Sequence, residues 1–274
     1  MTAIRQETHV RKRHRRCFRD DDVIHVSGSV DPSRDIEIIN LELALSDLNQ
    51  IEKRRTRLKK QISTIKEAKL EDDVLGKLSD ALENENAVRS VLLTDEEKKL
   101  IKPLGLLTEK PIIYATNLGE DELAKGNSFS EEVNTLATKE GSECVKISAQ
   151  VEAELIELGE EERDDYLNGL GVEEGGLISL IKATYRLLGL STYFTTGEKE
   201  TKAWTISDGM TAPQAAGVIH TDFEKGFIRA QTISYKKLLE AGSLVEARNK
   251  GWLRSEGKEY VVNEGDVMEF LFNV

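Results

Sequence analysis

Two apolar segments of the chain end in polar residues that are able to bind a ligand. Residues 111–117 read Pro-Ile-Ile-Tyr-Ala-Thr-Asn, and residues 143–149 read Glu-Cys-Val-Lys-Ile-Ser-Ala. Buried parallel strands have sequences of this kind, and α/β sheets bind ligands at the carboxyl ends of such strands. The polar residues at these ends are Asn117, Glu120, Ser148 and Gln150. The pattern predicts a ligand site there, although an asparagine at a strand end commonly serves only to form a turn.

Basic residues near the end of the chain are a second candidate for binding. They are Lys225, Arg229, Lys236, Lys237, Arg248, Lys250 and Arg254. Gathered on one face, they would contact the phosphates of RNA. Scattered lysines and arginines are also common on protein surfaces, where they contribute little. The sequence leaves both interpretations open.

Histidine and cysteine side chains add three further candidates. His220 lies between Ile219 and Thr221, where it either contacts RNA or fixes a turn through side-chain hydrogen bonds. Cys144 lies within an apolar run, which favours a small buried side chain over a redox sensor. Cys17 lies among basic residues, a setting that lowers the pKa of a thiol and makes it reactive.

The elements that would position these residues include a long helix. Asp31 and Pro32 are residue types favoured at the N-cap and the first helical position. Apolar residues then recur at steps of three, four or seven, which predicts an amphipathic helix of the coiled-coil type. They are Ile38, Leu41, Leu45, Leu48, Leu58, Ile62 and Ile65. A second set follows at the same steps, namely Leu70, Val74, Leu75, Leu78 and Leu82. Together the two sets predict an antiparallel helical hairpin.

Beyond this hairpin the pattern changes to short strands and helices. Thr94 and Glu97 have the spacing of a capping box, which predicts a short helix. The two apolar segments flank a helix predicted at 129–140, an order typical of an α/β sheet, and residues 151–190 read as helices. Further strands are predicted at 203–206, 226–233, 260–262 and 267–272, with helices at 212–219 and 235–241. Strands packed on one main helix in so short a segment indicate a β-grasp module.

The start of the chain is basic. Residues 11–19 contain six lysines and arginines and almost no apolar residue. This composition favours a solvated, disordered tail, with a basic RNA-binding arm as the alternative. Residues 23–28 then alternate like a short strand.

Composition narrows the class of protein. The chain has 274 residues, enough for about two domains with buried cores. Its formal charge of -12 argues against unspecific binding to duplex DNA, although a local basic patch would still suit RNA or a ribosome. No stretch approaches the length of an apolar membrane span, and the two cysteines form no CxxC. We therefore predict a cytoplasmic protein without a membrane partner and without a structural metal.

Three segments resemble the YchF (Obg-like) family of ATPases. Residues 215–230 read Ala-Ala-Gly-Val-Ile-His-Thr-Asp-Phe-Glu-Lys-Gly-Phe-Ile-Arg-Ala and, with residues 265–268 and 272–274, are similar to the family's TGS domain. Residues 20–36 resemble the family's entry into its inserted coiled-coil domain. The similarity runs from about Cys17 to Val274 and so covers nearly all of the chain.

The resemblance implies an α/β fold: a partial P-loop G domain with an inserted antiparallel helical coiled-coil hairpin, followed by a β-grasp (ubiquitin-like) TGS domain. It assigns residues 1–30 to a remnant of the G domain with an atypical basic start. Residues 31–106 would form the inserted coiled-coil domain, residues 107–196 the C-terminal part of the G domain, and residues 197–274 the TGS domain.

The resemblance also implies a nucleotide site. The family prefers ATP over GTP, and residues 117–120 (Asn-Leu-Gly-Glu) match its base-reading motif Asn-x-x-Glu. In guanine-specific relatives an aspartate there accepts the N1 and N2 protons of guanine, and adenine offers no such pair. Asn117 would buttress the base, and Leu118 would present its backbone and an apolar contact to the ring. The residues so assigned to ATP are Asn117, Leu118, Glu120, Ser148, Ala149 and Gln150.

The phosphate-binding motifs of the family are missing from this sequence. It contains no GxxxxGK[ST] loop, and no DxxG switch precedes residue 20. Phosphoryl transfer depends on an amide cradle, a lysine and a hydroxyl on Mg²⁺. ATP and Mg²⁺ are the cofactors that the family implies, but we expect weak ATP affinity and essentially no hydrolysis by this chain alone. We interpret the basic start as a truncated or frameshifted gene start, which would leave the edges of the sheet exposed.

Two hypotheses on function follow. The first is a YchF-type ATPase of translation and stress regulation, in which only the base-reading half of the site is present. The alternative is a nucleotide-independent module that binds RNA or the large ribosomal subunit through the TGS domain and the hairpin. Its contacts would be Lys225, Arg229, Lys236 and Lys237.

Overall fold

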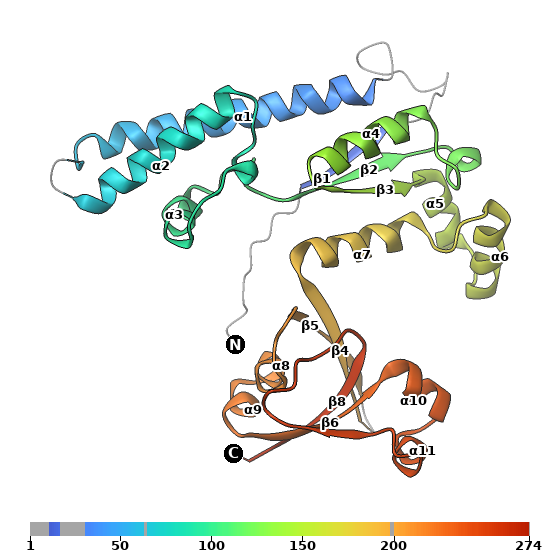
Figure 1. Cartoon of the computed structure of the whole chain (residues 1–274). Coiled ribbons are helices and arrows are strands. Elements are labelled where there is room, and N and C mark those ends of the chain that lie inside the picture. Colours follow the sequence, from blue (N-terminus) through green and yellow to red (C-terminus); the bar gives the residue numbers. More distant parts are fainter. Residues whose placement is uncertain (1–10, 17–30, 63–64, 198–199, 274) are drawn as a thin grey trace. The chain divides into compact units, whose positions relative to one another are not determined.

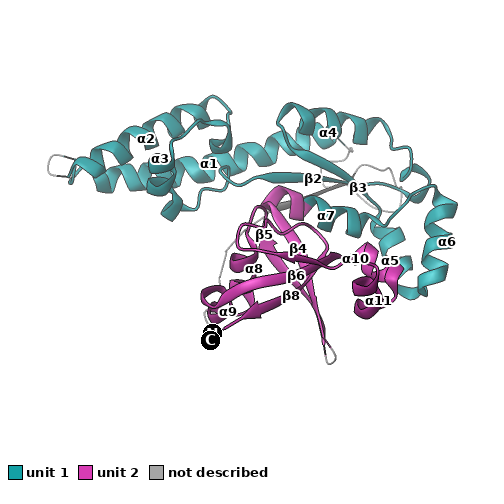
Figure 2. Cartoon of the chain, turned by 60° about the horizontal axis from the view of Figure 1, so that its bottom comes forward, with its two compact units in different colours: residues 1–183 teal, residues 184–274 magenta. Residues whose placement is uncertain are grey.

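The computed structural model describes residues 11–16, 31–62, 65–197 and 200–273. The chain divides into two compact units, residues 1–183 and residues 184–274, coloured teal and magenta in Figure 2. The strand predicted at 23–28 and the side chain of Cys17 lie outside the described residues. Within the described ranges, no helix has both the length and the apolar character needed to cross a membrane.

Unit 1 combines a small sheet with a set of helices (Figure 1). Its strands are β1 (Arg11–Arg16), β2 (Ile112–Asn117) and β3 (Glu143–Ile147). Its helices are α1 (Pro32–Leu58), α2 (Lys66–Glu83), α3 (Asp95–Ile101), α4 (Ser128–Lys139), α5 (Ala149–Glu157), α6 (Glu160–Leu170) and α7 (Gly176–Leu188), the last of which continues into unit 2. The helices predicted at 129–140 and within 151–190 are therefore confirmed.

The sheet of unit 1 is parallel, with the strand order β1-β2-β3. Helix α4 covers one of its faces (Figure 1). The buried cluster beneath α4 consists of Ile36, Ile112, Tyr114, Leu118, Val133 and Ala137. On the other face α7 approaches closely, because a Cβ on Gly176 would lie 2.8 Å from the Cα of Ile147. Both predicted strands are thus enclosed by helices, as their apolar sequences require.

The basic segment at residues 11–16 forms strand β1, contrary to the prediction of a solvated tail. It pairs with β2 in parallel, from Arg11 opposite Ile112 to Arg16 opposite Asn117. The ladder is made by backbone groups, which every residue here provides, so pairing needs no apolar side chain. The edge of β2 that we expected to be exposed is therefore covered, whereas β3 has no further strand beside it among the described residues.

Helices α1 and α2 pack side by side (Figure 1). Their shared core includes Ile51 and Leu58 of α1 and Val74, Leu75 and Leu78 of α2. Two arginine–carboxylate pairs join them as well: Arg54 bonds both oxygens of Glu71 at 2.6 and 2.7 Å, and the Nε of Arg55 lies 2.9 Å from Asp72. Bidentate pairs of this kind are stronger than single charged contacts.

The apolar stripe predicted on the first half of α1 is wrong. Ile38, Leu41 and Leu45 are 47, 54 and 57% exposed. The buried positions of α1 are instead Pro32, Ile36, Leu43, Asp47, Ile51 and Leu58. The first half of α1 packs against α4 through Ile36, so a different face of the helix is turned inward there. The helix also ends at Leu58, before the predicted positions Ile62 and Ile65.

A buried carboxylate lies in the middle of α1. Asp47 is fully buried and accepts hydrogen bonds from the backbone N–H groups of Leu107 and Thr108 at 2.8 and 2.7 Å. The Thr108 hydroxyl donates a third bond at 2.7 Å. These bonds fasten the segment that leads into β2 to the centre of α1.

Helix α3 begins at the predicted capping box. Glu97 accepts from the N–H of Thr94 at 2.8 Å, and the Thr94 hydroxyl accepts from the N–H of Glu97 at 3.2 Å. Lys77 of α2 donates to Glu97 at 2.8 Å. The Lys77 bond and the Thr94 bonds together lower the pKa of Glu97 to about 2. The cap thus also joins α3 to α2.

Unit 2 is built on a five-stranded sheet with the order β5-β4-β8-β6-β7. The strands are β4 (Leu190–Thr196), β5 (Thr201–Ser207), β6 (Phe227–Ser234), β7 (Arg254–Glu256) and β8 (Asp266–Phe272). The helices are α8 (Ala212–Ile219), α9 (Thr221–Lys225), α10 (Tyr235–Ala241) and α11 (Leu244–Asn249). Strand β4 lies before the predicted boundary at residue 197 but pairs with β5 and β8, so we place it with unit 2.

The core of unit 2 lies between the sheet and α8. Tyr193, Phe227 and Met268 of the sheet pack against Ala212, Ala215 and Ala216 of the helix. The strand predicted at 260–262 is not formed. Residue Val261 makes a single bridge to Thr211, flanked by two backbone bonds to the turn before α8, so the segment closes that turn and does not extend the sheet.

Glycine 226 marks a close backbone approach at the end of the sheet. The Asn273 N–H donates to the Gly226 carbonyl at 2.9 Å, directly after the Phe227–Phe272 pair of β6 and β8. A Cβ on Gly226 would overlap the Asn273 carbonyl oxygen and lie 2.9 Å from its carbonyl carbon. Only a residue without a side chain fits here.

Candidate functional site

The six residues predicted to bind a nucleotide lie at one end of the unit 1 sheet. Asn117 ends β2 and stands opposite Ile147, the last residue of β3. The loops that follow, residues 118–120 and 148–150, therefore start side by side. The parallel register brings together residues that are about thirty positions apart in sequence.

Asn117 joins the two loops directly. Its carboxamide oxygen accepts a hydrogen bond from the N–H of Ala149 at 2.9 Å. Ala149 is the first residue of α5, and the Ser148 hydroxyl before it caps the helix by accepting from Val151 at 3.5 Å. Asn117 thus satisfies one of the free N–H groups at the start of a helix. Its amide nitrogen has no hydrogen-bond partner among the described residues.

The residues predicted to bind a nucleotide differ in their exposure to solvent. Ala149 and Gln150 are exposed at the start of α5, whereas Ser148 is almost fully buried. The Leu118 side chain is 2% exposed and packs in the cluster beneath α4. The prediction that Leu118 offers an apolar contact to a base ring is therefore wrong, because its side chain faces the core. Its N–H donates to the Ile147 carbonyl at 2.8 Å.

Glu120 belongs to a network that the sequence did not predict. The hydroxyl of Tyr166, on α6, lies 3.2 Å from Glu120 Oε1 and also donates to Glu154 of α5. Gln150 donates to the other oxygen of Glu154 at 3.2 Å. The Tyr166 bond and then the Gln150 bond lower the pKa of Glu154. The hydrogen bond to Glu154 is the main cause of a raised pKa of Tyr166. Burial and the hydrogen bond to Glu120 raise this pKa further.

Tyr166 is held in place by its ring. The ring packs against a buried cluster of Leu123, Val151, Leu155 and Leu167. Arg163, one turn earlier on α6, donates from Nε to the Leu155 carbonyl at 2.6 Å. The hydroxyl therefore approaches the 118–123 loop from a fixed direction. Nothing in the acidic sequence around Tyr166 indicates this contact, since it depends on how α6 packs against α5.

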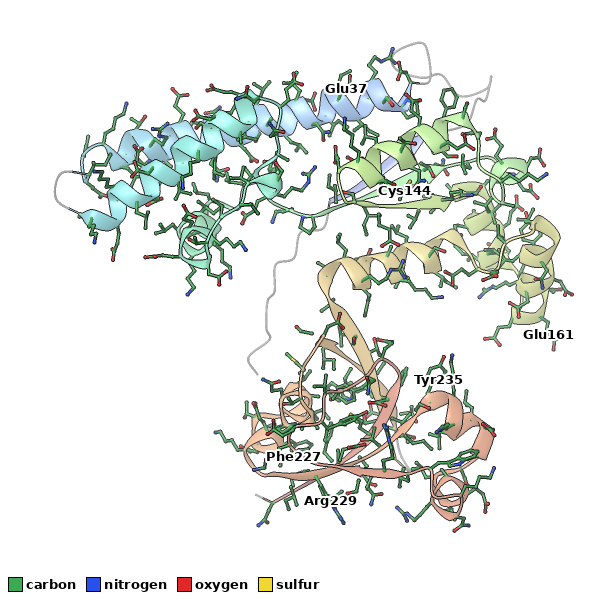
Figure 3. All side chains as sticks on the ribbon, viewed as in Figure 1. Glu37, Cys144, Glu161, Phe227, Arg229 and Tyr235 are labelled. Carbon is green, nitrogen blue, oxygen red and sulfur yellow. The ribbon has the colours of Figure 1, made fainter. Side chains whose placement is uncertain are left out.

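The basic residues predicted to bind RNA lie on three elements of unit 2. Lys225 ends α9, Arg229 lies in β6, and Lys236 and Lys237 lie in α10. All four side chains are exposed, and none of these side chains has a hydrogen bond or ion pair with another residue of the described part of the chain. Figure 3 places Arg229 on the outside of the sheet, at a distance along β6 from Tyr235, the first residue of α10.

The other basic residues considered for this face have partners. Arg248 donates to Gln231 at 3.1 Å, and the Nζ of Lys250 lies 4.6 Å from the centre of the Trp252 ring. Arg254 donates to the Tyr260 hydroxyl at 3.0 Å and lies 3.9 Å from Asp266. Arg254 in particular is part of the fold of unit 2.

His220 and Cys144 have structural surroundings. The Nδ1 of His220 accepts from the N–H of Asp222 at 3.2 Å and so caps α9, which agrees with the prediction that it fixes a turn. The turn at His220 therefore leads into the short helix α9. Cys144 packs beside the cluster beneath α4, and burial raises the pKa of its thiol. Cys144 is only half-buried, and its interpretation as a small buried side chain rather than a redox sensor stays a prediction.

These features define a mixed α/β protein whose candidate ligand site lies at the carboxyl ends of two neighbouring parallel strands. Residues 190–273 match the family model YchF-GTPase_C, described as "Protein of unknown function (DUF933)". This match covers all the strands of unit 2.

Longer matches cover almost the whole chain. It is 50% identical over 262 residues to the ribosome-binding ATPase YchF of Bacillus subtilis, covering 94% of this chain and 72% of that protein. It is 51% identical over 260 residues to the protein of the same name in Escherichia coli O157:H7, with 94% and 71% covered. The solved YchF GTPase of Schizosaccharomyces pombe superposes with a TM-score of 0.78 at 34% identity, with 94% and 71% covered. The chain belongs to the YchF family.

Proposed function

We propose that this chain recognises the adenine base of a nucleotide at the ends of β2 and β3, as part of a ribosome-associated YchF-type ATPase. In this proposal the β2–β3 sheet is the C-terminal part of a G domain, α1 and α2 form its inserted coiled-coil hairpin, and unit 2 is a TGS domain of the β-grasp type. Support comes from relatives named ribosome-binding ATPases at about half sequence identity.

The observation that carries the proposal is the bond from Ala149 to Asn117. It holds two loops together at 2.9 Å and leaves the Asn117 amide nitrogen free of partners in the described part of the chain. Exposed Ala149 and Gln150 lie next to it at the N-terminus of α5, which carries partial positive charge. These groups fit a planar, polar base, with Leu118 contributing backbone only.

We assign no residues of this chain to binding of the nucleotide's phosphates or of Mg²⁺. The sequence contains no GxxxxGK[ST] motif. The proposal is therefore confined to recognition of the base. Binding by base contacts alone is expected to be weak, since the triphosphate makes the strong charge-assisted bonds. Hydrolysis is not assigned to residues of this chain.

Titration with ATP and GTP tests the base site. We expect ligand-observed NMR to detect ATP binding and a weaker response to GTP. Asn117→Ala removes the bridge between the loops and should reduce ATP affinity about 3- to 10-fold, the range for loss of one hydrogen bond. Asn134→Ala, at an exposed position of α4, is the control and should change nothing. Equal binding of ATP and GTP, or an unaltered Asn117→Ala variant, would contradict the proposal.

A second candidate function, binding to the ribosome through unit 2, is favoured by the names of the relatives and by four exposed basic residues without partners in the described part of the chain. We expect co-sedimentation with the large ribosomal subunit at moderate salt, and its loss when the four are changed to glutamate. They are Lys225, Arg229, Lys236 and Lys237. The control reverses four exposed lysines of unit 1, namely Lys99, Lys102, Lys125 and Lys139. Loss of binding in both variants would indicate an effect of net charge only and would reject this surface.

A further inference from the structure

The Tyr166 hydroxyl stands between two carboxylates that come from different elements. Glu120 lies in the loop after β2, and Glu154 lies in α5. A hydroxyl has one proton, so it donates fully to only one of the two at a time. The contact with Glu154 is the shorter of the two, so the Tyr166 proton lies mainly toward Glu154, and the 3.2 Å contact with Glu120 is the weaker one.

Apart from this contact, the loop that carries Glu120 is held at its two ends and by a hydrogen bond from Asn127 to Glu122 at 2.9 Å. Leu118 is buried before it, and Leu123 is buried after it. Between them the backbone makes one 3-10 turn, in which the N–H groups of Glu122 and Leu123 donate to the carbonyls of Gly119 and Glu120, both at 3.2 Å. The Glu120 side chain is partly exposed. The contact with Tyr166 is what fixes the direction of its carboxylate.

The direction of this carboxylate matters for the choice of base. A free carboxylate accepts two parallel hydrogen bonds, and guanine offers two adjacent N–H donors on one edge. Adenine has no such pair. A carboxylate with one oxygen held at the Tyr166 hydroxyl is not free to turn both oxygens toward the same edge of a base, so it gives guanine little advantage.

We propose that Tyr166 is a specificity-determining positioning residue, whose hydroxyl holds Glu120 toward α6 and so prevents it from accepting the two guanine protons. This inference rests on the base site proposed above. Tyr166 acts through Glu120 and does not touch the nucleotide. Without the hydroxyl, Glu120 turns freely and GTP gains affinity relative to ATP.

The test compares Tyr166→Phe with a matched control. Tyr114→Phe removes another hydroxyl of unit 1 that donates to a glutamate, Glu140, at 2.8 Å. The preference for ATP over GTP, measured by ligand-observed NMR, should fall about 3- to 10-fold in Tyr166→Phe, as for loss of one hydrogen bond. It should be unaltered in Tyr114→Phe. In a Glu120→Ala background, Tyr166→Phe should have no further effect, because the carboxylate is absent.

Hydrogen exchange provides a readout that needs no nucleotide. We expect the amides of residues 119–123 to exchange faster in Tyr166→Phe and to be unaltered in Tyr114→Phe. Unaltered exchange, an unaltered nucleotide preference, or the same effect in the Glu120→Ala background would each overturn the role of Tyr166. If the original chain binds neither nucleotide, the base site fails and the selectivity role fails with it, whereas the exchange result still decides whether Tyr166 holds the loop.

Discussion

Replacing Gly226 with alanine is expected to destabilise unit 2 by about 3 kcal/mol, at the upper end of the cost of overpacking. The added Cβ would overlap the Asn273 carbonyl oxygen, which is backbone and so has no alternative rotamer. Relief requires the end of β8 to move away from β6. That movement would also break the Asn273–Gly226 hydrogen bond and disturb Phe272, whose ring stacks on Phe223 with centroids 3.8 Å apart.

Tryptophan fluorescence during urea unfolding measures this effect selectively. Both tryptophans of the chain, Trp204 and Trp252, lie in unit 2. Gly257→Ala is a control, because a Cβ there meets nothing within 4 Å and the backbone is not left-handed. The Gly257→Ala variant should have the same urea midpoint, followed by tryptophan fluorescence, as the original chain. An equal midpoint for Gly226→Ala and the original chain would show that the sheet end accommodates a side chain.

Asp47→Ala is expected to destabilise unit 1 by about 3 kcal/mol or more, because several buried donors lose a charged acceptor together. The N–H groups of Leu107 and Thr108 and the Thr108 hydroxyl all depend on this carboxylate. Thr108 is 4% exposed, so water reaches it poorly. Asp47→Asn keeps one acceptor oxygen and places an NH₂ against the remaining donors. We therefore expect Asp47→Asn to destabilise unit 1, but by less than Asp47→Ala.

Far-UV circular dichroism reports this change, since unit 1 holds the long helices α1 and α2. The helical transition should shift to lower urea in Asp47→Ala while the tryptophan transition stays in place. Glu42→Ala removes an exposed carboxylate from the same helix and serves as the control, with an expected effect within about 0.5 kcal/mol. A shift as small as that of Glu42→Ala would mean that the 107–108 segment finds other partners.

Local signals in the sequence predicted several helix starts and a buried strand correctly. Asp31 followed by Pro32 marks the start of α1, and Thr94 with Glu97 marks the start of α3. These signals work because the residues that form each cap are neighbours in sequence. The strand at 112–117 was predictable for a related reason: both of its faces are covered, so its apolar run is continuous.

The errors arose where a distant contact decides the outcome. On α1 two apolar faces compete, and the face carrying Ile36 is buried because α4 packs there. Nothing within residues 32–58 reveals the position of α4. Strand β1 could not be predicted from an alternating pattern, because six consecutive basic or histidine residues contain none. Its pairing is with the backbone of β2.

For the candidate site, sequence reasoning selected the residues but not all of their roles. We predicted correctly that Asn117 and Ala149 lie close together, because both positions lie at or just after the ends of neighbouring strands. Leu118 was assigned an outward side chain, whereas its position between a buried strand and a tight turn directs it into the core. Tyr166 was missed, since its contact with Glu120 spans 46 positions and depends on the packing of α6 against α5.

Helix α1 is continuous and connects two separate buried clusters of unit 1. Its 27 residues correspond to a rod about 40 Å long, for which a tilt of about 5° about one end displaces the other end by about 3.5 Å. One end is embedded with Ile36 beneath α4, and the other with Leu58 against α2. Asp47 lies between them and is hydrogen-bonded to the segment that enters β2. One continuous helix thus connects the core shared with α2 to the segment that leads into β2, the strand that ends in Asn117.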